Sequence, residues 1–294
     1  MTGRRPHVVV VGDVGLDVVS KVAGPIVFGH DTRASITVTP GGAGGNTAAW
    51  LSRHDVDVSL VARVGNDQAG RAAAAELAAV GITCRFAVDP VLPTCCVVVL
   101  VGDDGDRTML ADRGANRSFC AADVDLPALP DDERPAHLHV SGYVLLDEGS
   151  RAGGLAALAA AKERGWTVSV DPQAALHIRT VGAATFLRWV AGADLLLPND
   201  AELAVLGGVE AVLDSVGAVV VTHGRHGASW YSSRVRANVP APDAHDTDST
   251  GAGDAFNAGL LASWLTARDE VAALQAGVAA GTAAAAAIGA RPTG

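Results

Sequence analysis

The chain of 294 residues carries a formal net charge of −10 at pH 7, and 49% of its residues are hydrophobic. An acidic chain without a cluster of Lys or Arg lacks the surface that binds a nucleic-acid backbone or an anionic membrane, so we expect neither as a partner. The length and apolar content suit one large α/β domain with a substantial core.

Neither end of the chain indicates export or membrane insertion. The N-terminal apolar run at residues 8–11 is shorter than the roughly 7–15 apolar residues of a signal peptide. The Ala-rich segment 272–287 is too weakly apolar for a membrane span of about 20 residues. The cysteines lack CxxC spacing. We therefore expect a cytoplasmic protein with reduced, structural thiols at Cys84, Cys95, Cys96 and Cys120.

Runs of Val, Ile and Leu alternate with Ala-rich segments along most of the chain, which is typical of a parallel sheet covered on both faces. Strands are predicted at residues 8–11, 58–61, 137–140, 167–170, 195–197 and 219–222. Helices are predicted at residues 45–54, 70–80, 150–164, 180–191, 200–207, 252–266 and 269–287. The predicted fold class is α/β, a single domain over residues 1–294 with a doubly wound, mainly parallel sheet and helices on both faces.

Two segments, about 14–40 and 94–117, contain strand-like residues without a crossover helix. Asp104-Gly105 in the second segment is a hairpin-turn signal. We expect the two segments to form a small β-sheet lid, with extra edge strands on the main sheet as the alternative. The lid would leave unpaired edges and apolar positions, so a homodimer through the lid is a further hypothesis.

The stretch DSTGAGDAF at residues 248–256 runs directly into a predicted apolar helix. The N–H groups of Gly251, Ala252 and Gly253 would lie at the helix N-terminus, where free amides and the helix dipole attract an anion. Asp254 would lie in the first turn, within reach of that anion, where it could accept a proton from an attacking hydroxyl. Simple capping of the helix by Asp254 or Ser249 is the alternative.

A second glycine cluster, GGAGGN at residues 41–46, precedes the first predicted helix. Its glycines let a ligand approach the main chain, and Asn46 can both donate and accept hydrogen bonds, which suits a polyhydroxylated ligand. The cluster is not a P-loop, and no Rossmann fingerprint follows the first strand. Together the two clusters predict a phosphate site and a polar-ligand site.

With PNDAE at 198–202 and VVTHGRHGA at 220–228, the two glycine motifs resemble the ribokinase-like (PfkB) carbohydrate kinase family in order and spacing. The resemblance covers nearly the whole chain. It implies a ribokinase-like fold with a β-lid and ATP-dependent phosphorylation of a sugar hydroxyl.

The resemblance also assigns roles to residues. It implies that Asp254 is the catalytic base and that the amides of the glycine turn stabilise the transferring phosphoryl group. The implied sugar-binding residues are Asp17, Gly41, Gly42 and Asn46. For Asp17, loop capping is the alternative.

The nucleotide half of the site follows from the same resemblance. It implies nucleotide binding by Asn199, Thr222, Gly224 and Gly227, with the adenine near Gly281 and Thr282. Glu202 would hold Mg²⁺ through water. Asp248 and Thr250 would contribute to a site for a monovalent cation such as K⁺.

The identity of the sugar stays open. The segment Gly114-Ala115-Asn116 resembles ribokinase and favours a pentose, whereas Ala43 stands where the ribokinase motif has Lys. Fructose, another sugar or a 2-keto-3-deoxy sugar acid are alternatives. A nucleoside kinase of the same fold is disfavoured by the aromatic content of 4%. A non-catalytic sugar-binding regulatory protein is disfavoured, because a protein that only binds has little reason to keep a base beside a phosphate site.

Other polar residues receive simpler interpretations. His137 and His139 are expected to point to opposite faces of a strand and so not to bind one metal ion. His223 and His226 are expected at the surface near the nucleotide. Arg107 and Arg113 would lie on the lid, where they could contact the substrate.

Overall fold

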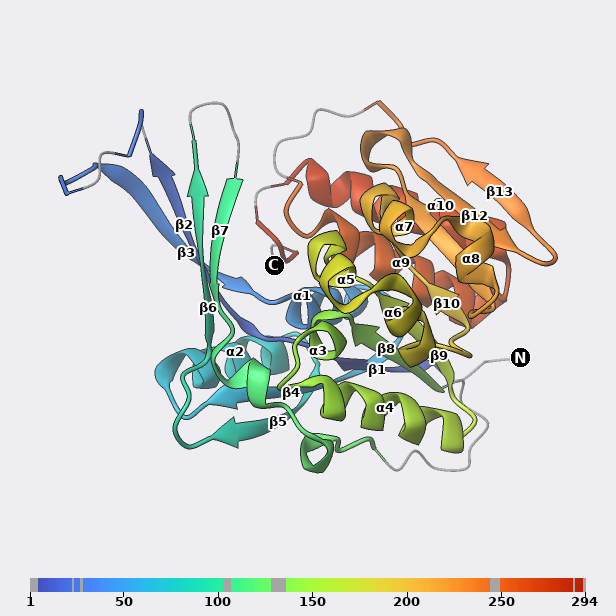
Figure 1. Cartoon of the computed structure of the whole chain (residues 1–294), viewed down its shortest axis with the longest axis horizontal. Coiled ribbons are helices and arrows are strands. Elements are labelled where there is room, and N and C mark those ends of the chain that lie inside the picture. The colour runs from blue at the N-terminus through green and yellow to red at the C-terminus, as the bar shows by residue number, and fades with distance from the viewer. Residues whose placement is uncertain are drawn as a thin grey trace.

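A computed structural model describes residues 5–22, 24–26, 29–102, 107–127, 136–243, 249–287 and 289–292. Its large sheet has nine strands in the order β13-β12-β11-β10-β9-β8-β1-β4-β5, and helices cover both faces (Figure 1). The strands are β1 His7–Val11, β4 Asp57–Gly65, β5 Thr83–Asp89, β8 Ala136–Ser141, β9 Thr167–Asp171, β10 Leu195–Leu196, β11 Ala218–Thr222, β12 Ala228–Ser232 and β13 Arg236–Val239.

The helices alternate with these strands along most of the chain. They are α1 Ala43–Leu51, α2 Gln68–Ala79, α3 Tyr143–Leu146, α4 Arg151–Glu163, α5 Ala175–Val181, α6 Ala183–Trp189, α7 Asp200–Leu206, α8 Val209–Leu213, α9 Ala252–Ala267 and α10 Glu270–Ala285. The predicted α/β class, a mainly parallel sheet with helices on both faces, is confirmed.

The central strand β1 explains why its sequence is continuously apolar. Val8 and Val10 pack into the core on one face of the sheet, and Val9 and Val11 pack into the core on the other face. All four side chains are fully buried. Helices cover both faces of the sheet, which accounts for the apolar side chain at each of these four positions.

The order of the strands reverses at β1, which pairs in parallel with β4 on one side and with β8 on the other. In an open α/β sheet, ligands bind in the crevice at the carboxyl ends of the strands beside such a switch point. This edge of the sheet is therefore the expected place for a site.

The sequence prediction missed part of the large sheet and most of one helix. Strands β5, β12 and β13 were not predicted, and β12 pairs antiparallel with both β11 and β13. The helix predicted at 180–191 corresponds to α6 and includes only the last two residues of α5. Gly182, with a φ of 87°, separates the two helices.

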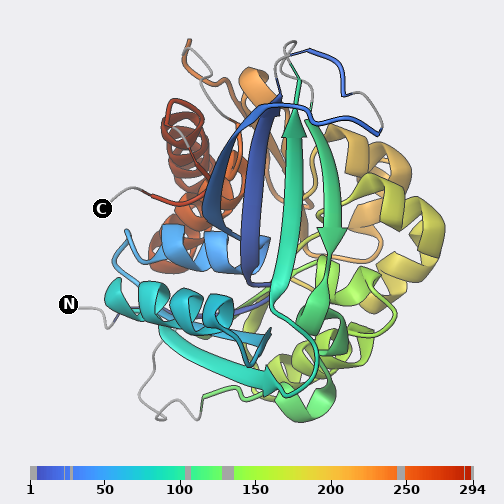
Figure 2. The same cartoon turned by 90° about the vertical axis from the view of Figure 1, so that its left-hand side faces the viewer.

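A small sheet, separate from the large one, contains β2 Gly15–Val22, β3 Ala34–Gly41, β6 Cys95–Val101 and β7 Arg107–Asp112 in the order β3-β2-β6-β7. Its two halves come from the two predicted segments, which pair through β2 and β6 in parallel. Asp104-Gly105 lies outside the described residues. The alternative of extra edge strands on the main sheet is wrong. Figure 2 shows the small sheet rising from the body of the molecule.

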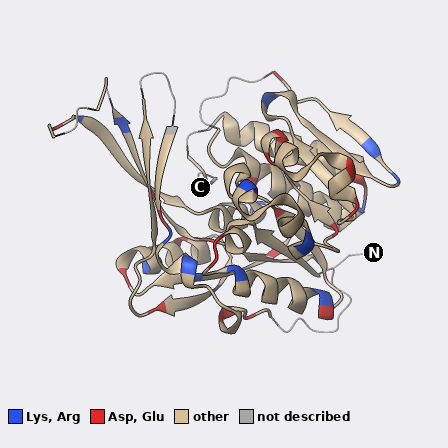
Figure 3. Ribbon diagram, in the orientation of Figure 1, with Lys and Arg blue, Asp and Glu red and all other residues tan. Residues whose placement is uncertain are grey.

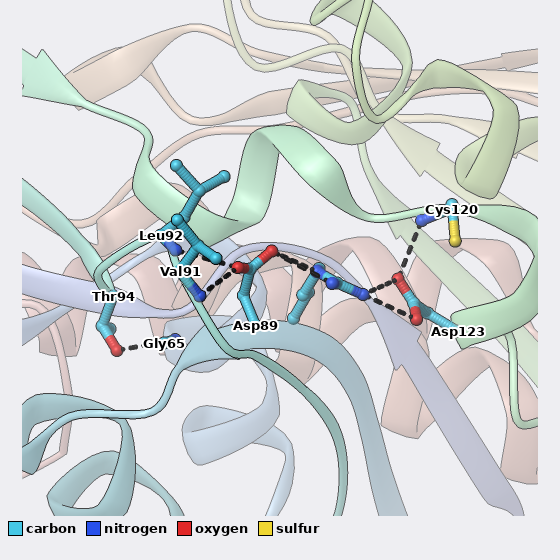
Figure 4. A network of polar contacts seen from close by, with 8 residues as sticks. Gly65, Asp89, Val91, Leu92, Thr94, Cys120 and Asp123 are labelled. Carbon is cyan, nitrogen blue, oxygen red and sulfur yellow. Dashed lines mark hydrogen bonds and ion pairs between the residues drawn. The ribbon is translucent and has the colours of Figure 1, made fainter.

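Polar contacts fix the point where the chain leaves the large sheet for β6 (Figure 4). Arg63 on β4 lies between two carboxylates, 3.0 Å from Asp89 and 2.9 Å from Asp123. Asp89 accepts two backbone N–H groups of the following turn. Thr94 Oγ1 then accepts the N–H of Gly65 at 3.0 Å. The base of the small sheet is thus tied to β4, while its far end extends away.

His137 and His139 lie on one face of β8, so the prediction of opposite faces is wrong. Nε2 of His137 and Nδ1 of His139 both contact the Ser169 hydroxyl, at 2.7 and 2.8 Å. Side chains two residues apart on a strand share a face. Within the described part of the chain, no group of three or more His, Cys, Asp or Glu residues is arranged to hold a metal ion.

None of the helices in the described ranges is both long and apolar enough to cross a bilayer. The four cysteines are free thiols.

Candidate active site

Helix α9 begins at a glycine turn near the carboxyl edge of the large sheet. Its N-cap, Gly251, has a φ of 76°, and a Cβ atom there would overlap the carbonyl oxygen of Ala290. Gly253, by contrast, faces open space. The first turn of this 16-residue helix therefore presents its main chain, at the positive end of the helix dipole, to an approaching ligand.

A cavity of about 570 Å³ opens beside this turn. This volume lies within the range of roughly 300–1,000 Å³ that is usual for small-molecule sites. The lining brings together α9, α10 and the loop after β11, and it includes the predicted residues Thr222, Gly224, Gly227, Ala252, Gly253, Gly281 and Thr282. The structure thus gathers most of the predicted nucleotide-binding residues at one cavity.

Asp254 lies in the first turn of α9 and points toward α1. Thr47 Oγ1 donates to Asp254 Oδ1 at 2.8 Å, and Asn46 Nδ2 lies 3.4 Å from Oδ2. Burial raises the pKa of Asp254 to about 7, although the bonds from Thr47 and Asn46 oppose the rise. A carboxyl group with a pKa near neutrality is matched to proton transfer at physiological pH.

Asp13, at the end of β1, holds the glycine motif in place. Its carboxylate accepts the Gly44 N–H at 3.2 Å and the Ser141 hydroxyl at 3.1 Å, and it pairs with Arg113 at 3.1 Å. Burial alone would raise the pKa of Asp13, but Arg113 and the Gly44 N–H lower it below its usual value. Asp13 is therefore an ionised structural anchor, and Arg113 is bound to it.

Asp17 lies on β2, where its carboxylate covers Gly41 at the end of β3. A Cβ atom at Gly41 would overlap this carboxylate, so the glycine makes room for it. Burial and the nearby Asp13 raise the pKa of Asp17 to about 6, and Arg291 opposes the rise. Asp17, Gly41 and Asn46 thus form a polar cluster on the side of Asp254 that faces the small sheet.

Asn199 and Glu202 cap helix α7 reciprocally. Asn199 Oδ1 accepts the Glu202 N–H at 2.9 Å, and Glu202 Oε2 accepts the Asn199 N–H at 2.9 Å. A parallel β-bridge also pairs Asn199 with Thr222, which lines the cavity. Burial raises the pKa of Glu202, although the bonds from Asn199 lower it.

Asp171, at the end of β9, is a further carboxyl group near Glu202 and Asp254. Burial, then Glu202, then Asp254 raise the pKa of Asp171 well above its usual value. Asn257 Nδ2 donates to Asp171 Oδ2 at 2.7 Å. Carboxyl groups that repel one another are stabilised by a cation between them, and oxygen ligands are those that Mg²⁺ prefers. The donor set therefore fits Mg²⁺ held through water and phosphate oxygens rather than in a cage of side chains.

The remaining predicted cation ligands are placed only in part. Thr250 belongs to the turn that leads into α9, and Asp248 lies outside the described residues. The side chain of Arg107 is also outside the description. His223 is bound between Asp200 and Ser229, at 2.7 and 2.8 Å.

Sequence reasoning missed three site residues, Thr47, Asp171 and Arg291. Thr47 could have been found, because it follows Asn46 in the first turns of the same helix. Asp171 had a weaker signal, as an acid at the carboxyl end of a predicted strand. Arg291 had none, because its neighbours in the site lie about 245 positions away in the chain.

A helix N-terminus whose main chain is open to a ligand, beside a carboxyl group with a pKa near 7, is an arrangement that suits phosphoryl transfer to an alcohol. Residues 5–293 match the model of the pfkB family carbohydrate kinases. The chain belongs to this family, as the resemblance predicted, and is a phosphotransferase with an alcohol group as acceptor.

Three relatives cover nearly the whole chain. The ATP-dependent ribose-1-phosphate kinase of Halopiger xanaduensis is 33% identical over 278 residues, which are 92% of this chain and 88% of that protein. A putative ribokinase II from E. coli, solved with ATP and Mg²⁺, has a TM-score of 0.85 at 25% identity and covers 97% of this chain and 94% of its own. The fructokinase of Vibrio cholerae O395, solved with fructose, ADP and calcium, has a TM-score of 0.79 at 28% identity, covering 98% and 95%.

Proposed function

We propose that the protein transfers the γ-phosphate of ATP to a hydroxyl group of an uncharged pentose or ketohexose, with Asp254 as the catalytic base. The observation that carries this proposal is the position of Asp254. Asp254 is buried, which raises its pKa to about 7, and it accepts hydrogen bonds from Thr47 and Asn46 on α1. It lies in the first turn of α9, the same turn as the proposed anion site at the glycines.

In the proposed reaction the sugar lies between the edge of the large sheet and the small sheet, held by Asp17, Gly41, Gly42 and Asn46. The small sheet acts as a lid whose closure excludes water that would otherwise hydrolyse ATP. Asp254 accepts the hydroxyl proton while the sugar oxygen bonds to the γ-phosphorus and the bond to the β-phosphate oxygen breaks. The amides of Gly251, Ala252 and Gly253 stabilise the negative charge of the transferring group.

The cavity beside α9 receives the nucleotide in this proposal. Thr222, Gly224 and Gly227 line it, and Asn199 is joined to Thr222 by a β-bridge. Glu202 would hold Mg²⁺ through water, where the ion would neutralise phosphate charge. The E. coli relative solved with ATP and Mg²⁺ supports this assignment. Activation by K⁺ through Thr250 and Asp248 is part of the proposal, and Asp248 lies outside the described residues.

The charges around the sugar site favour an uncharged acceptor. Arg113 is paired with Asp13 at 3.1 Å, and Arg291 is paired with Glu76 at 3.1 Å. These two guanidinium groups are thus already paired with carboxylates, while Asp17 and Asp254 add negative charge when ionised. The fructokinase solved with fructose supports a neutral sugar. Ribose 1-phosphate, the substrate named for the Halopiger relative, is the competing candidate.

We further propose that two copies associate through the outer face of the small sheet. The strand register aligns Val38, Val18, Val98 and Leu110 across all four strands, on the face opposite to Asp17. Val38 is 60% exposed and Leu110 is 55% exposed. The ribbons of this sheet carry few charged positions (Figure 3), which suits burial against a second copy. Sedimentation of a monomer at working concentration would remove this proposal.

The four free cysteines are compatible with a reducing compartment, so we propose that the enzyme acts in the cytoplasm.

The reaction is tested by ADP release from Mg-ATP, with and without K⁺, over ribose, fructose, ribose 1-phosphate, 2-keto-3-deoxygluconate and adenosine. We expect the strongest signal with fructose or ribose, and its loss in Asp254→Asn but not in the matched variant Asp214→Asn on the exposed end of α8. A preference for ribose 1-phosphate would overturn the uncharged acceptor, and a preference for adenosine would favour the nucleoside kinase. ATP binding without turnover of any acceptor would favour the non-catalytic regulatory protein.

A further inference from the structure

The segment 289–292 lies between the two motifs of the site. The carbonyl oxygen of Ala290 accepts a hydrogen bond from Trp50 Nε1 on α1 at 3.0 Å, and the same residue packs against Gly251 at the start of α9. Ala290 is 5% exposed. These contacts place the next residue, Arg291, at the sugar side of the glycine turn.

The Arg291 guanidinium reaches three groups there. Nε donates to Asn46 Oδ1 at 3.1 Å, one terminal nitrogen donates to the Gly41 carbonyl at 3.0 Å, and the other pairs with Glu76 on α2 at 3.1 Å. The side chain is only 7% exposed. A Cβ atom at Gly45 would lie 2.5 Å from this guanidinium, so a side chain at that position would displace it.

These contacts determine how the Asn46 amide is turned. A guanidinium has only hydrogen-bond donors, so Asn46 must present its oxygen to Arg291. Its amide nitrogen then faces Asp254 Oδ2, at 3.4 Å. If the amide were reversed, two donors would meet at Arg291 and an acceptor would meet the carboxylate.

We propose that Arg291 is a positioning residue of the phosphoryl transfer, which fixes the Asn46 amide so that it donates to Asp254. This inference rests on the proposed role of Asp254 as the base. Arg291 need not touch the sugar or ATP to act in this way, because it acts on Asp254 through Asn46 and through its charge.

The charge of Arg291 acts in the same direction as the hydrogen bond. Among the residues that the structure describes, the titratable groups that face Asp254 are the carboxyl groups of Asp13, after β1, and Asp171, at the end of β9, together with the Arg291 guanidinium. Burial and Asp13 raise the pKa of Asp254, while Arg291 lowers it. Loss of Arg291 therefore makes the proton acceptor harder to ionise.

The variants Arg291→Gln and Arg291→Lys separate the two effects. The glutamine removes the charge, and its amide can turn either way, so Asn46 is no longer fixed. The lysine keeps the charge but cannot bind Asn46, Gly41 and Glu76 with one planar group. Arg188→Gln, on the exposed surface of α6, is the matched control.

The decisive readout is the titration of the Asp254 carboxyl carbon, followed by NMR in protein labelled at aspartate and identified by its loss in Asp254→Asn. We expect Arg291→Gln to raise the midpoint by about one pH unit, Arg291→Lys to raise it by less, and the control to leave it unchanged. This measurement does not require activity. An unchanged midpoint in Arg291→Gln would overturn the inference. If the glutamine variant does not fold, an unchanged midpoint and full activity in Arg291→Lys would overturn it instead.

Kinetics distinguish the inference from the proposed function. With the accepted sugar, we expect Arg291→Gln to lower kcat about tenfold or more, with the acid limb of the pH profile moved upward and KM for ATP nearly unchanged. Activity in Asp254→Asn equal to the parent would remove the proposed function. A parent that depends on Asp254, with full kcat in a folded Arg291→Gln variant, would remove only the role of Arg291.

Discussion

Thr47 Oγ1 donates a 2.8 Å hydrogen bond to Asp254 Oδ1, across 207 positions of the chain. The bond joins α1, which begins within the sugar-side glycine motif, to α9, which begins within the phosphate-side motif. Because Asp254 is buried, this donor favours the ionised form of the base that burial disfavours. The two glycine motifs are thus connected through the group that accepts the proton.

Replacing Thr47 by Val removes this donor with little change of shape. A hydrogen bond to a charged group contributes about 1.5–3 kcal/mol, so the pKa of Asp254 should rise by about one to two units. We expect kcat to fall about 10-fold or more at pH 6 and much less at pH 8.5. Steady-state kinetics over this range measure the effect, and Thr47→Ser, which keeps the hydroxyl, is the control. Equal losses at both pH values would contradict the account.

The raised pKa of Asp254 also predicts how stability depends on pH. The folded protein holds this proton more tightly than the unfolded chain, since burial raises the pKa from 3.8 to about 7. This contribution to stability is complete below about pH 4 and is lost as the pH rises through 7. We therefore expect urea unfolding to show that Asp254→Asn gains stability relative to the parent between pH 5 and pH 8. A constant difference over this range would speak against a buried, titrating carboxyl.

Two alanine variants of the glycine turn should behave differently. At Gly251 the positive φ and the nearby Ala290 carbonyl leave no room for a methyl group, so Gly251→Ala should lower both the unfolding temperature and kcat. At Gly253 no heavy atom lies within 4 Å of the place that a methyl group would occupy, so Gly253→Ala should fold normally. Because Gly253 lines the cavity, this variant should instead raise KM for ATP. Thermal unfolding and ATP titration separate the two, and equal stability losses would contradict the packing described.

Asp17 is proposed to accept hydrogen bonds from sugar hydroxyls. Asp17→Asn replaces a charged acceptor by a neutral amide, which costs about 1.5–3 kcal/mol of binding, or roughly 10- to 100-fold in KM for the sugar. KM for ATP should change little. Kinetics with the sugar and ATP varied in turn test this, and a change confined to ATP would move Asp17 out of the sugar site.

Most of the fold could be predicted because the sequence patterns that mark its elements are local. The apolar run of β1 and the glycine motifs at the starts of α1 and α9 can be recognised without knowing which residues pack against them. The short strands β12 and β13 were missed because each mixes polar and apolar residues, so no long apolar run marks them. The error on His137 and His139 came from applying the strand period wrongly. Residues two positions apart on a strand share a face, so the two histidines should have been predicted on the same face.

The site was predictable only where one motif supplies the residue. Asp254, Asn46 and Glu202 each lie within a recognisable stretch, and the structure brings them to one edge of the sheet. Arg291 and Arg113 belong to no such motif. Each takes part in the site through a residue far away in the chain, Asn46 for Arg291 and Asp13 for Arg113. Arg113 was expected on the lid, where it could contact substrate, and its pairing with Asp13 depends on a residue 100 positions away in the chain.

The most direct test of the account is the turnover of Asp254→Asn on the accepted sugar at pH 8, compared with the parent and with Asp214→Asn. If Asp254 is the base, kcat should fall by about 10²–10⁴-fold while KM for ATP stays within a few-fold, because only the proton acceptor is lost. Turnover within a few-fold of the parent would show that Asp254 is not the base.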